Sequence, residues 1–236
     1  MKIAVIPARG GSKRITRKNL REFYGRPILS YAIELAINSG MFAHVVVSTE
    51  DTEIARVARD CGAEVPFQRP QMLADDFTTT VSVIANAVHA CDSLGWRADF
   101  VCCIYPTAVF SMPEDLENAF KLLVKSGADY CFPIAQFPSP VQRALKKSIT
   151  GELQPIDASS ELCRTQDLEP AYYDAGQFYW GRRDSWVKAK PIHSNAVGYV
   201  IQSWRAVDID SEEDWNQAEI VYEVLRLRNK PPHRRM

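Results

Sequence analysis

Residues 1–19 read MKIAVIPARGGSKRITRKN and join a short apolar run to a glycine turn and a group of cations. The run from Lys2 to Pro7 is β-branched and unpatterned, which is typical of a strand covered on both faces in a parallel sheet. Gly10 and Gly11 allow the backbone to turn and to present consecutive N–H groups to an anion. No acid precedes Glu22. The stretch therefore predicts a loop that binds a polyphosphate. Its cations are Arg9, Lys13, Arg14, Arg17 and Lys18.

The basic turn by itself leaves other interpretations open. Similar groups of cations occur in solvated loops and in contacts with nucleic acid. The standard nucleotide motifs GxxxxGK[ST] and GxGxxG are both absent. Charge alone thus indicates an anion without identifying it.

Length and composition favour a single α/β domain, residues 1–236, with an added lobe. At 236 residues and 46% hydrophobic content, the chain can bury a substantial core. The net charge of −1 makes the basic turn a local feature, which argues against a surface that coats nucleic acid. No apolar run reaches the roughly 20 residues of a membrane span, and the N-terminus lacks a signal-peptide pattern. We expect a cytoplasmic enzyme without a membrane partner.

Cysteine and histidine spacing contains no metal or redox motif. The six cysteines include no CxxC pair, and the four histidines show no HExxH spacing. Most of the cysteines have apolar neighbours, so we expect buried free thiols.

Apolar strands alternate with amphipathic helices after the basic turn. We expect helices at 29–40, 52–61 and from about 80 onwards, and strands at 44–48, 64–67, 100–105, 130–135 and 196–202. Ser111 with Glu114, and Ser211 with Asp214, predict capping boxes at the starts of two further helices. This order predicts a Rossmann-like, mostly parallel sheet with helices on both faces. We expect the tail at 229–236 to be mobile.

Between about 136 and 182 the helical alternation disappears. A turn at Gly151, a polar loop and the aromatic run YYDAGQFYW at 172–180 indicate a hairpin-like excursion. We therefore expect an inserted arm at 136–182.

Several motifs in order carry a resemblance to a known family. They are IPARGGSK at 6–13 with Lys18-Asn19, STEDTEIA at 48–55, RPQMLADD at 69–76, YPT at 105–107 and DID at 208–210. The chain resembles the cytidylyltransferases that activate nine-carbon keto acids, which include the CMP-sialic acid synthetases. The likeness spans nearly the whole chain and implies a nucleotide-diphospho-sugar transferase type of fold.

The resemblance implies that the basic turn contacts the nucleotide. The matching positions are Ala8, Arg9, Gly10, Gly11, Ser12, Lys13, Lys18 and Asn19. Lys18, with Arg9, is implied to be catalytic because charge develops at the α-phosphate. Arg69 and Thr80 match positions that read cytosine. Thr80 could instead cap a helix, and Thr79 is then the alternative.

Asp208 and Asp210 lie two residues apart, so on an extended strand both carboxylates point to one side. Their repulsion favours a cation between them, and Mg²⁺ accepts such ligands together with substrate phosphates. Capping of the final helix by Asp210 is the alternative. The resemblance implies metal binding and a catalytic role for both.

The aromatic run and Arg164 suit an acidic sugar. Aromatic faces pack on C–H surfaces and acyl methyl groups, and an arginine fork matches a carboxylate. The alternative for the run is a place in the core. The resemblance implies sugar contacts for Tyr105, Arg164, Tyr173, Asp174, Gln177 and Phe178, and a dimerisation role for the arm.

Two departures from the family indicate the acceptor. Sialic acid synthetases typically carry QPTSPLR and NGAIY where this chain has YPTAVF at 105–110 and DAGQFYW at 174–180. Both changes replace polar groups with apolar or aromatic ones and favour a less hydroxylated sugar. Within the family, the chain looks most like the members that act on pseudaminic acid.

We therefore expect a homodimer that uses Mg²⁺ and CTP to place CMP on the anomeric hydroxyl of pseudaminic acid, releasing pyrophosphate. Sialic, legionaminic or shorter keto-deoxy acids are the alternative acceptors. A non-catalytic CTP sensor and a nucleic-acid-binding module are alternatives of other classes. The base that accepts the hydroxyl proton stays open. The resemblance also implies that the product decorates flagella or surface glycans.

Overall fold

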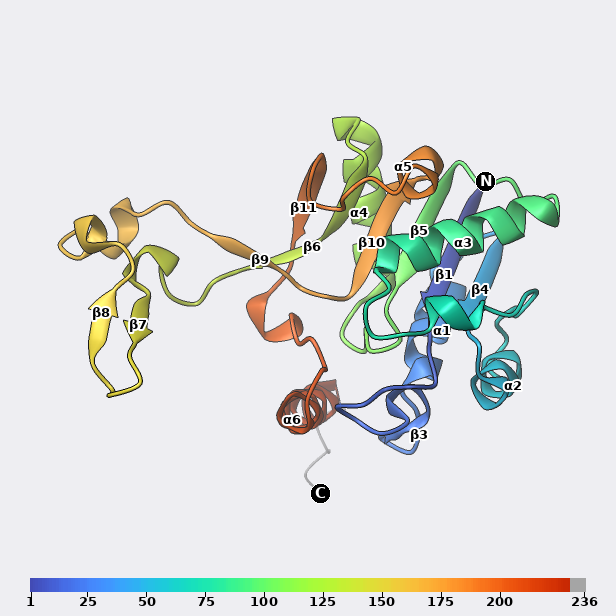
Figure 1. Cartoon of the computed structure of the whole chain (residues 1–236), viewed down its shortest axis with the longest axis horizontal. Coiled ribbons are helices and arrows are strands. Elements are labelled where there is room, and N and C mark those ends of the chain that lie inside the picture. The colour runs from blue at the N-terminus through green and yellow to red at the C-terminus, as the bar shows by residue number, and fades with distance from the viewer. Residues whose placement is uncertain (230–236) are drawn as a thin grey trace, which may run out of the picture.

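The centre of the molecule is a seven-stranded mixed sheet, seen in a computed structural model that describes residues 1–229 (Figure 1). The strand order is β11-β6-β10-β5-β1-β4, and β9 pairs with β6. The strands are β1 (Lys2–Pro7), β4 (His44–Ser48), β5 (Phe100–Ile104), β6 (Tyr130–Gln136), β9 (Tyr172–Asp174), β10 (Phe178–Arg182) and β11 (Ala196–Val200). The tail predicted to be mobile lies, from residue 230 on, outside the described residues.

Five of the seven strands run in the same direction, as the predicted mostly parallel sheet requires, and β9 and β10 run against them. β1 pairs in parallel with β4 and β5, and β11 pairs in parallel with β6. β10 is the exception in the middle, because it runs antiparallel between β5 and β6. Its first residue, Phe178, therefore pairs with Ile104 at the carboxyl end of β5. The turn that precedes β10 thus lies at the same sheet edge as the loop after β1.

Helices cover both faces of the sheet, which confirms the predicted α/β layering. The helices are α1 (Leu29–Asn38), α2 (Thr52–Asp60), α3 (Thr80–Ser93), α4 (Pro113–Ser126), α5 (Arg183–Val187) and α6 (Glu212–Asn229). Along β1, Ala4 and Ile6 pack in the core formed with α1, α2 and α4. Ile3 and Val5 face the opposite core, formed with α3 and α5. An unpatterned apolar strand is what burial on both faces requires.

Two local predictions were wrong. Residues 64–67 form no strand, since only Glu64 makes a single bridge to Val46, and Pro66 lacks the N–H that would extend the pairing. The helix predicted to start at Ser111 is capped one residue later. The Asp115 carboxylate accepts the Met112 N–H at 2.7 Å, and Ser111 instead donates to Gln177 Oε1.

The box at the start of α6 was predicted correctly. The Ser211 hydroxyl accepts the Asp214 N–H at 3.2 Å, and the Asp214 carboxylate accepts the Ser211 N–H at 2.7 Å. Behind it, Trp215 and Ala218 are buried against Phe23 from the small hairpin of β2 (Glu22–Phe23) and β3 (Arg26–Pro27).

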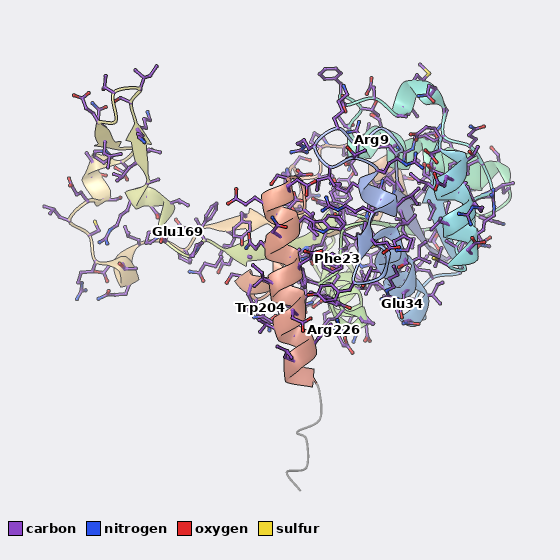
Figure 2. All side chains as sticks on the ribbon, turned by 90° about the horizontal axis from the view of Figure 1, so that it is seen from below. Arg9, Phe23, Glu34, Glu169, Trp204 and Arg226 are labelled. Atoms are coloured by element: carbon purple, nitrogen blue, oxygen red, sulfur yellow. The ribbon has the colours of Figure 1, made fainter. Side chains whose placement is uncertain are left out.

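The arm is shorter than predicted. Residues 137–171 leave the sheet, and both views show them projecting from the main body, with Glu169 near their base (Figures 1 and 2). They contain the hairpin of β7 (Leu145–Lys147) and β8 (Leu153–Pro155), which turns at Gly151 as predicted. Residues 172–182, assigned to the arm from the sequence, are β9, β10 and the turn between them. They pair inside the main sheet because their alternating aromatic side chains can be buried on both faces.

The cysteines are free thiols, and Cys91, Cys102, Cys103 and Cys131 are buried, as expected. Burial raises the pKa of the Cys91 thiol to about 11 and that of Cys131 to about 12. Within residues 1–229, every helix is too short or too polar to cross a membrane.

A buried ion pair fixes the segment that leads to α6. Arg205 binds Asp115, and each side chain is only 6% exposed. Arg205 also donates to the Phe110 carbonyl oxygen at 2.9 Å, and its own carbonyl oxygen accepts from the Gln177 side chain. The segment carrying residues 206–210 is thereby held against the start of α4 and the turn before β10.

Arg205→Ala should lower the free energy of unfolding by about 3–5 kcal/mol, because it leaves the buried Asp115 carboxylate without a cation. Urea denaturation followed by circular dichroism measures the change. Arg56→Ala is the matched control, since Arg56 pairs with Asp60 on the exposed face of α2 and should contribute less than about 1 kcal/mol. Equal losses for the two variants would contradict the role assigned to Arg205.

Candidate active site

A cavity of about 750 Å³ opens at the sheet edge where β1 and β5 end and β10 begins. This is the edge at which open α/β sheets bind ligands. The predicted site residues that line it are Arg9, Ser12, Lys13, Lys18, Asn19, Arg69, Thr80, Tyr105, Asp174, Asp208 and Asp210. Segments from the start, the middle and the end of the chain therefore meet in one place.

The basic loop is held from both ends. Asn19 donates its side-chain N–H to the Arg9 carbonyl oxygen at 2.9 Å, which closes the loop. Arg17 takes a left-handed conformation with φ of 54° and binds Asp51 at the start of α2. Gly10 has no room for a side chain, because a Cβ atom there would lie 2.5 Å from Asp51 Oδ2. Gly10 is not among the glycines with positive φ, so close packing against Asp51, and not φ freedom, accounts for this glycine.

The remaining predicted nucleotide contacts occupy different places. Ala8 is fully buried beneath the loop and does not line the cavity. The Gly10 N–H, an expected phosphate donor, donates to Glu50 Oε1 at 2.7 Å. Gly11 has open space around its Cα. A phosphate role for the Gly10 amide would require Glu50 to release it.

The cavity cations are paired with carboxylates. Arg9 and Lys13 both bind Asp76, at 2.7 and 2.5 Å. Arg14 lies 2.9 Å from Asp210, and Lys18 Nζ lies 3.2 Å from the other oxygen of the same carboxylate. Lys18 also donates to the Ile209 carbonyl oxygen at 2.7 Å, so residues 191 positions apart are in direct contact.

Asp208 differs from the other acids because, among residues 1–229, it accepts no hydrogen bond and forms no ion pair. Its side chain is open to the cavity yet surrounded by protein atoms. Burial, followed by the charge of Asp210, raises the pKa of Asp208 to about 6, although Lys18 acts in the opposite direction. A carboxylate in this environment gains stability from a nearby cation.

The Asp208 and Asp210 pair fits Mg²⁺. Within residues 1–229, no group of three or more His, Cys, Asp or Glu side chains is placed to hold a metal ion. Mg²⁺ does not need such a group, because it is commonly held by one or two carboxylates, water and substrate phosphates. These two carboxylates, next to cations suited to phosphates, form such an incomplete donor set.

The candidate cytosine side contains Arg69 and Thr80. Arg69 is almost fully buried and donates to the hydroxyl and the carbonyl oxygen of Ser48 at the end of β4. Thr79, not Thr80, caps α3 by accepting the Ser82 N–H. The Thr80 hydroxyl instead lies 2.7 Å from the Tyr105 hydroxyl inside the cavity. The helix-cap alternative therefore applies to Thr79.

The predicted sugar residues divide into two groups. Tyr105 and Asp174 line the cavity. Phe178 is fully buried in the core on the opposite face of β10, and Gln177 is buried with its amide bound to the Arg205 carbonyl oxygen. The core interpretation of the aromatic run thus holds for Phe178.

Tyr173 and Arg164 also lie outside the cavity lining. The Tyr173 ring packs against Phe137 at the base of the arm. Arg164 is on the arm and pairs with Asp167, three residues further on. Within one chain, neither side chain reaches the cavity.

Tyr179, Asp75 and Asp76 also line the cavity and were not predicted as site residues, whereas Arg14 was named among the cations of the basic loop. Tyr179 lies on the cavity side of β10 and donates to Asp174 at 3.0 Å, next to the Tyr105 ring at 5.3 Å. Strand alternation could have found it, because Phe178 and Tyr179 must face opposite sides. Asp75 and Asp76 end the quoted motif RPQMLADD, and their charge opposite a basic loop was the available signal.

Comparison with known proteins defines the class to which this fold and cavity belong. The family model described as Cytidylyltransferase matches residues 3–222. The chain therefore belongs to the cytidylyltransferase family.

Within that family, the chain is 38% identical over 225 residues to a pseudaminic acid cytidylyltransferase of Campylobacter jejuni, covering 94% of this chain and 96% of that one. It is 29% identical to a CMP-N,N'-diacetyllegionaminic acid synthase of Legionella pneumophila, with the same two coverages, 94% and 96%. A solved CMP:2-keto-3-deoxy-manno-octonic acid synthetase complexed with CTP superposes with a TM-score of 0.70 at 16% identity, covering 95% and 99% of the two chains. The last likeness establishes the fold alone.

The raised pKa of Asp208 predicts a pH-dependent stability. A carboxyl group whose pKa rises from 3.8 to about 6 on folding stabilises the fold below pH 4, and this contribution is lost as the pH rises through 6. Asp208→Asn should therefore melt at a higher temperature than wild type at pH 8 in EDTA, and the difference should shrink towards pH 4. Thermal melts across this range measure it. Asp60→Asn, in an exposed ion pair, should show no comparable trend. Equal melting temperatures of wild type and Asp208→Asn at pH 8 would contradict the raised pKa of Asp208.

Proposed function

We propose that this protein transfers CMP from CTP to the anomeric hydroxyl of pseudaminic acid and releases pyrophosphate. Membership of the cytidylyltransferase family supports CTP as the donor. The similarity to a relative named pseudaminic acid cytidylyltransferase, over nearly the full length of both chains, supports the acceptor. The structural observation that carries the proposal is the meeting of the basic loop with Asp208 and Asp210 through Lys18.

In the proposed reaction, the anomeric oxygen forms a bond to the α-phosphorus as the bond between that phosphorus and the bridging oxygen breaks. The electron pair of the broken bond leaves with pyrophosphate, and the hydroxyl proton passes to a base. Little covalent chemistry is required of the protein. Catalysis then comes from positioning the two substrates and from compensating charge on the phosphates.

Each part of the cavity receives one part of the substrates. Lys18 leaves Asp210 to bind the α-phosphate, where charge develops, while Arg9 and Lys13 hold the departing pyrophosphate. Arg69 and Thr80 contact the cytosine. The Thr80 hydroxyl is hydrogen-bonded to the Tyr105 hydroxyl. Cytosine at Thr80 and the sugar at Tyr105 would therefore contact two side chains that are bound to each other.

Mg²⁺ would be held by Asp208 and Asp210 together with the nucleotide. When bound, the ion neutralises phosphate charge and polarises the phosphoryl oxygens. The Asp208 carboxylate would then gain the cationic partner that it lacks among the described side chains.

The acceptor end of the cavity favours a partly apolar sugar. Tyr105 and Tyr179 present aromatic rings, which suit methyl and acetamido groups, and Asp174 accepts hydrogen bonds. Gln177 no longer supports this choice, because its side chain is buried away from the cavity. The preference over sialic acid therefore rests on Tyr105 and Tyr179.

The alternatives of other classes have weaker support. A nucleic-acid-binding surface needs cations that are free to meet phosphates, whereas Arg9, Lys13 and Arg14 form ion pairs with acids of the cavity. A CTP sensor without activity would not need the acidic pair, which this chain retains beside Lys18.

A homodimer would cover the arm. Residues 145–162 of the arm expose several large apolar side chains to water, among them Ile149, Ile156 and Leu162, the last being 97% exposed. An exposed apolar surface of this kind marks a protein interface. Since Arg164 cannot reach the cavity of its own chain, its implied contact with the acceptor carboxylate would be made in the partner subunit.

The proposed location and product use follow from the substrates. CTP is a cytoplasmic metabolite, and free thiols fit a reducing compartment. A CMP-activated sugar acid serves as a glycosyl donor, and we propose flagellar or other surface glycans as its destination.

Pyrophosphate release with CTP and Mg²⁺ should be fastest with pseudaminic acid in a panel that includes sialic, legionaminic and keto-deoxy-octonic acids. Asp210→Ala should reduce release at least a thousandfold with every acceptor, because the Mg²⁺ that would compensate the phosphate charge loses one of its two carboxylate ligands. A coupled phosphate assay measures both. Substantial turnover by Asp210→Ala with metal present, or a clear preference for sialic acid, would contradict the assignment.

Leu162→Glu should shift the protein from dimer to monomer, because it places a charge in the proposed apolar interface. Sedimentation velocity measures the mass of the particle. Asn38→Glu, at the exposed end of α1 and outside the arm, adds the same charge and serves as the control. A wild type that sediments as a monomer at micromolar concentration would contradict the dimer.

A further inference from the structure

The loop at residues 70–79 forms one wall of the cavity. It follows the buried Arg69, which is bound to Ser48 at the end of β4, and it leads to the start of α3. Its middle has few supports. The Asp75 carboxylate accepts the N–H groups of Phe77 and Thr78, which keeps the turn in shape. Phe77 itself is 91% exposed and Met72 79% exposed. The loop thus has the buried Arg69 at one end, the capped start of α3 at the other and exposed side chains at its centre.

Asp76, at the centre of this loop, occupies the two cations that the proposed function assigns to phosphate. Its Oδ1 accepts from Arg9 at 2.7 Å, and its Oδ2 lies 2.5 Å from Lys13 Nζ. Arg9 also donates to the Asp75 carbonyl oxygen at 2.7 Å. These two ion pairs lower the pKa of Asp76, Lys13 contributing more than Arg9. One carboxylate therefore uses both of its oxygens as a phosphate would.

Other carboxylates also bind the basic loop, but they are less able to leave. Glu50 binds the Gly10 N–H from the segment between β4 and α2, and its Oε2 atom is buried. Asp210 belongs to the proposed metal pair and precedes the capped start of α6. Asp76 alone among these three lies on an irregular, exposed wall of the cavity, so it can be displaced without unfolding a helix or a strand.

We propose that Asp76 is an internal competitor of phosphate, which vacates Arg9 and Lys13 when the triphosphate enters and returns to them as pyrophosphate leaves. The proposal rests on the proposed function for the identity of the ligand. It assigns Asp76 a role in the affinity for the donor and in the release of the product, not in the chemical step. Asp76 thus lowers the affinity of the site for phosphate. After each turnover it again forms ion pairs with Arg9 and Lys13.

The test is calorimetric titration of tripolyphosphate and of pyrophosphate into the full chain, without acceptor, at fixed low salt. Asp76→Asn removes the competing charge and keeps the shape of the side chain. It should bind both probes about fivefold more tightly than wild type, the gain expected from removing two exposed ion pairs. Pyrophosphate should also inhibit CTP turnover by Asp76→Asn at a correspondingly lower concentration.

Three variants separate the contact from other effects. Asp60→Asn changes the net charge equally on the exposed face of α2 and should leave both affinities unchanged. Asp76→Glu keeps the charge and should bind the probes like wild type. Asp75→Asn loosens the turn without removing the carboxylate from Arg9 and Lys13, so it should not reproduce the fivefold gain.

The outcomes distinguish this inference from the proposed function. Equal or weaker binding of both probes by Asp76→Asn, with CTP turnover retained by wild type, would overturn the competitor role alone. A wild type and an Asp76→Asn variant that both fail to bind either probe would overturn the phosphate site and, with it, the proposed function.

Discussion

The contact of Lys18 with Ile209 and Asp210 joins the basic loop after β1 to the acidic segment before α6. The site depends on this contact. The ammonium lies between a carbonyl oxygen and a carboxylate that are 191 and 192 positions further along the sequence. Without this cation, the like charges of Asp208 and Asp210 would repel each other. With it, a strongly basic loop and an acidic segment can share one wall. Positive and negative side chains therefore offset one another in the cavity before any substrate enters it.

The antiparallel strand β10 decides which residues of the preceding turn face the cavity. In a purely parallel sheet, a turn that precedes a strand lies at the edge opposite to the ligand. Because β10 runs against β5 and β6, the turn with Asp174 and Gly176 lies instead at the ligand edge. Gly176 has a φ of 63° and leaves no room for a Cβ atom beside Asp208. The buried Arg205–Asp115 pair then holds the acidic segment against this turn.

Most of the charged groups in the cavity are paired with a group of opposite charge or with a hydrogen-bond donor. Arg9 and Lys13 bind Asp76, Arg14 and Lys18 bind Asp210, and the Gly10 amide binds Glu50. The pair of Lys13 with Asp76 is among the more exposed of these, and exposed pairs of this kind contribute little to stability. The same arrangement keeps the basic loop from presenting bare cations to other polyanions.

The sequence by itself determined the layering, the basic loop and the acidic pair, because strand periodicity, helix caps and ordered motifs are local signals. β1, β4, β5 and α6 lie within a residue or two of their predicted bounds. Which residues from distant parts of the chain lie next to each other was decided only by the tertiary structure. Whether Phe178 or Tyr179 faces the cavity depends on the register of β10, and whether Arg164 reaches a sugar depends on the direction of the arm. Neither register nor direction is encoded in neighbouring residues, since both arise from long-range packing.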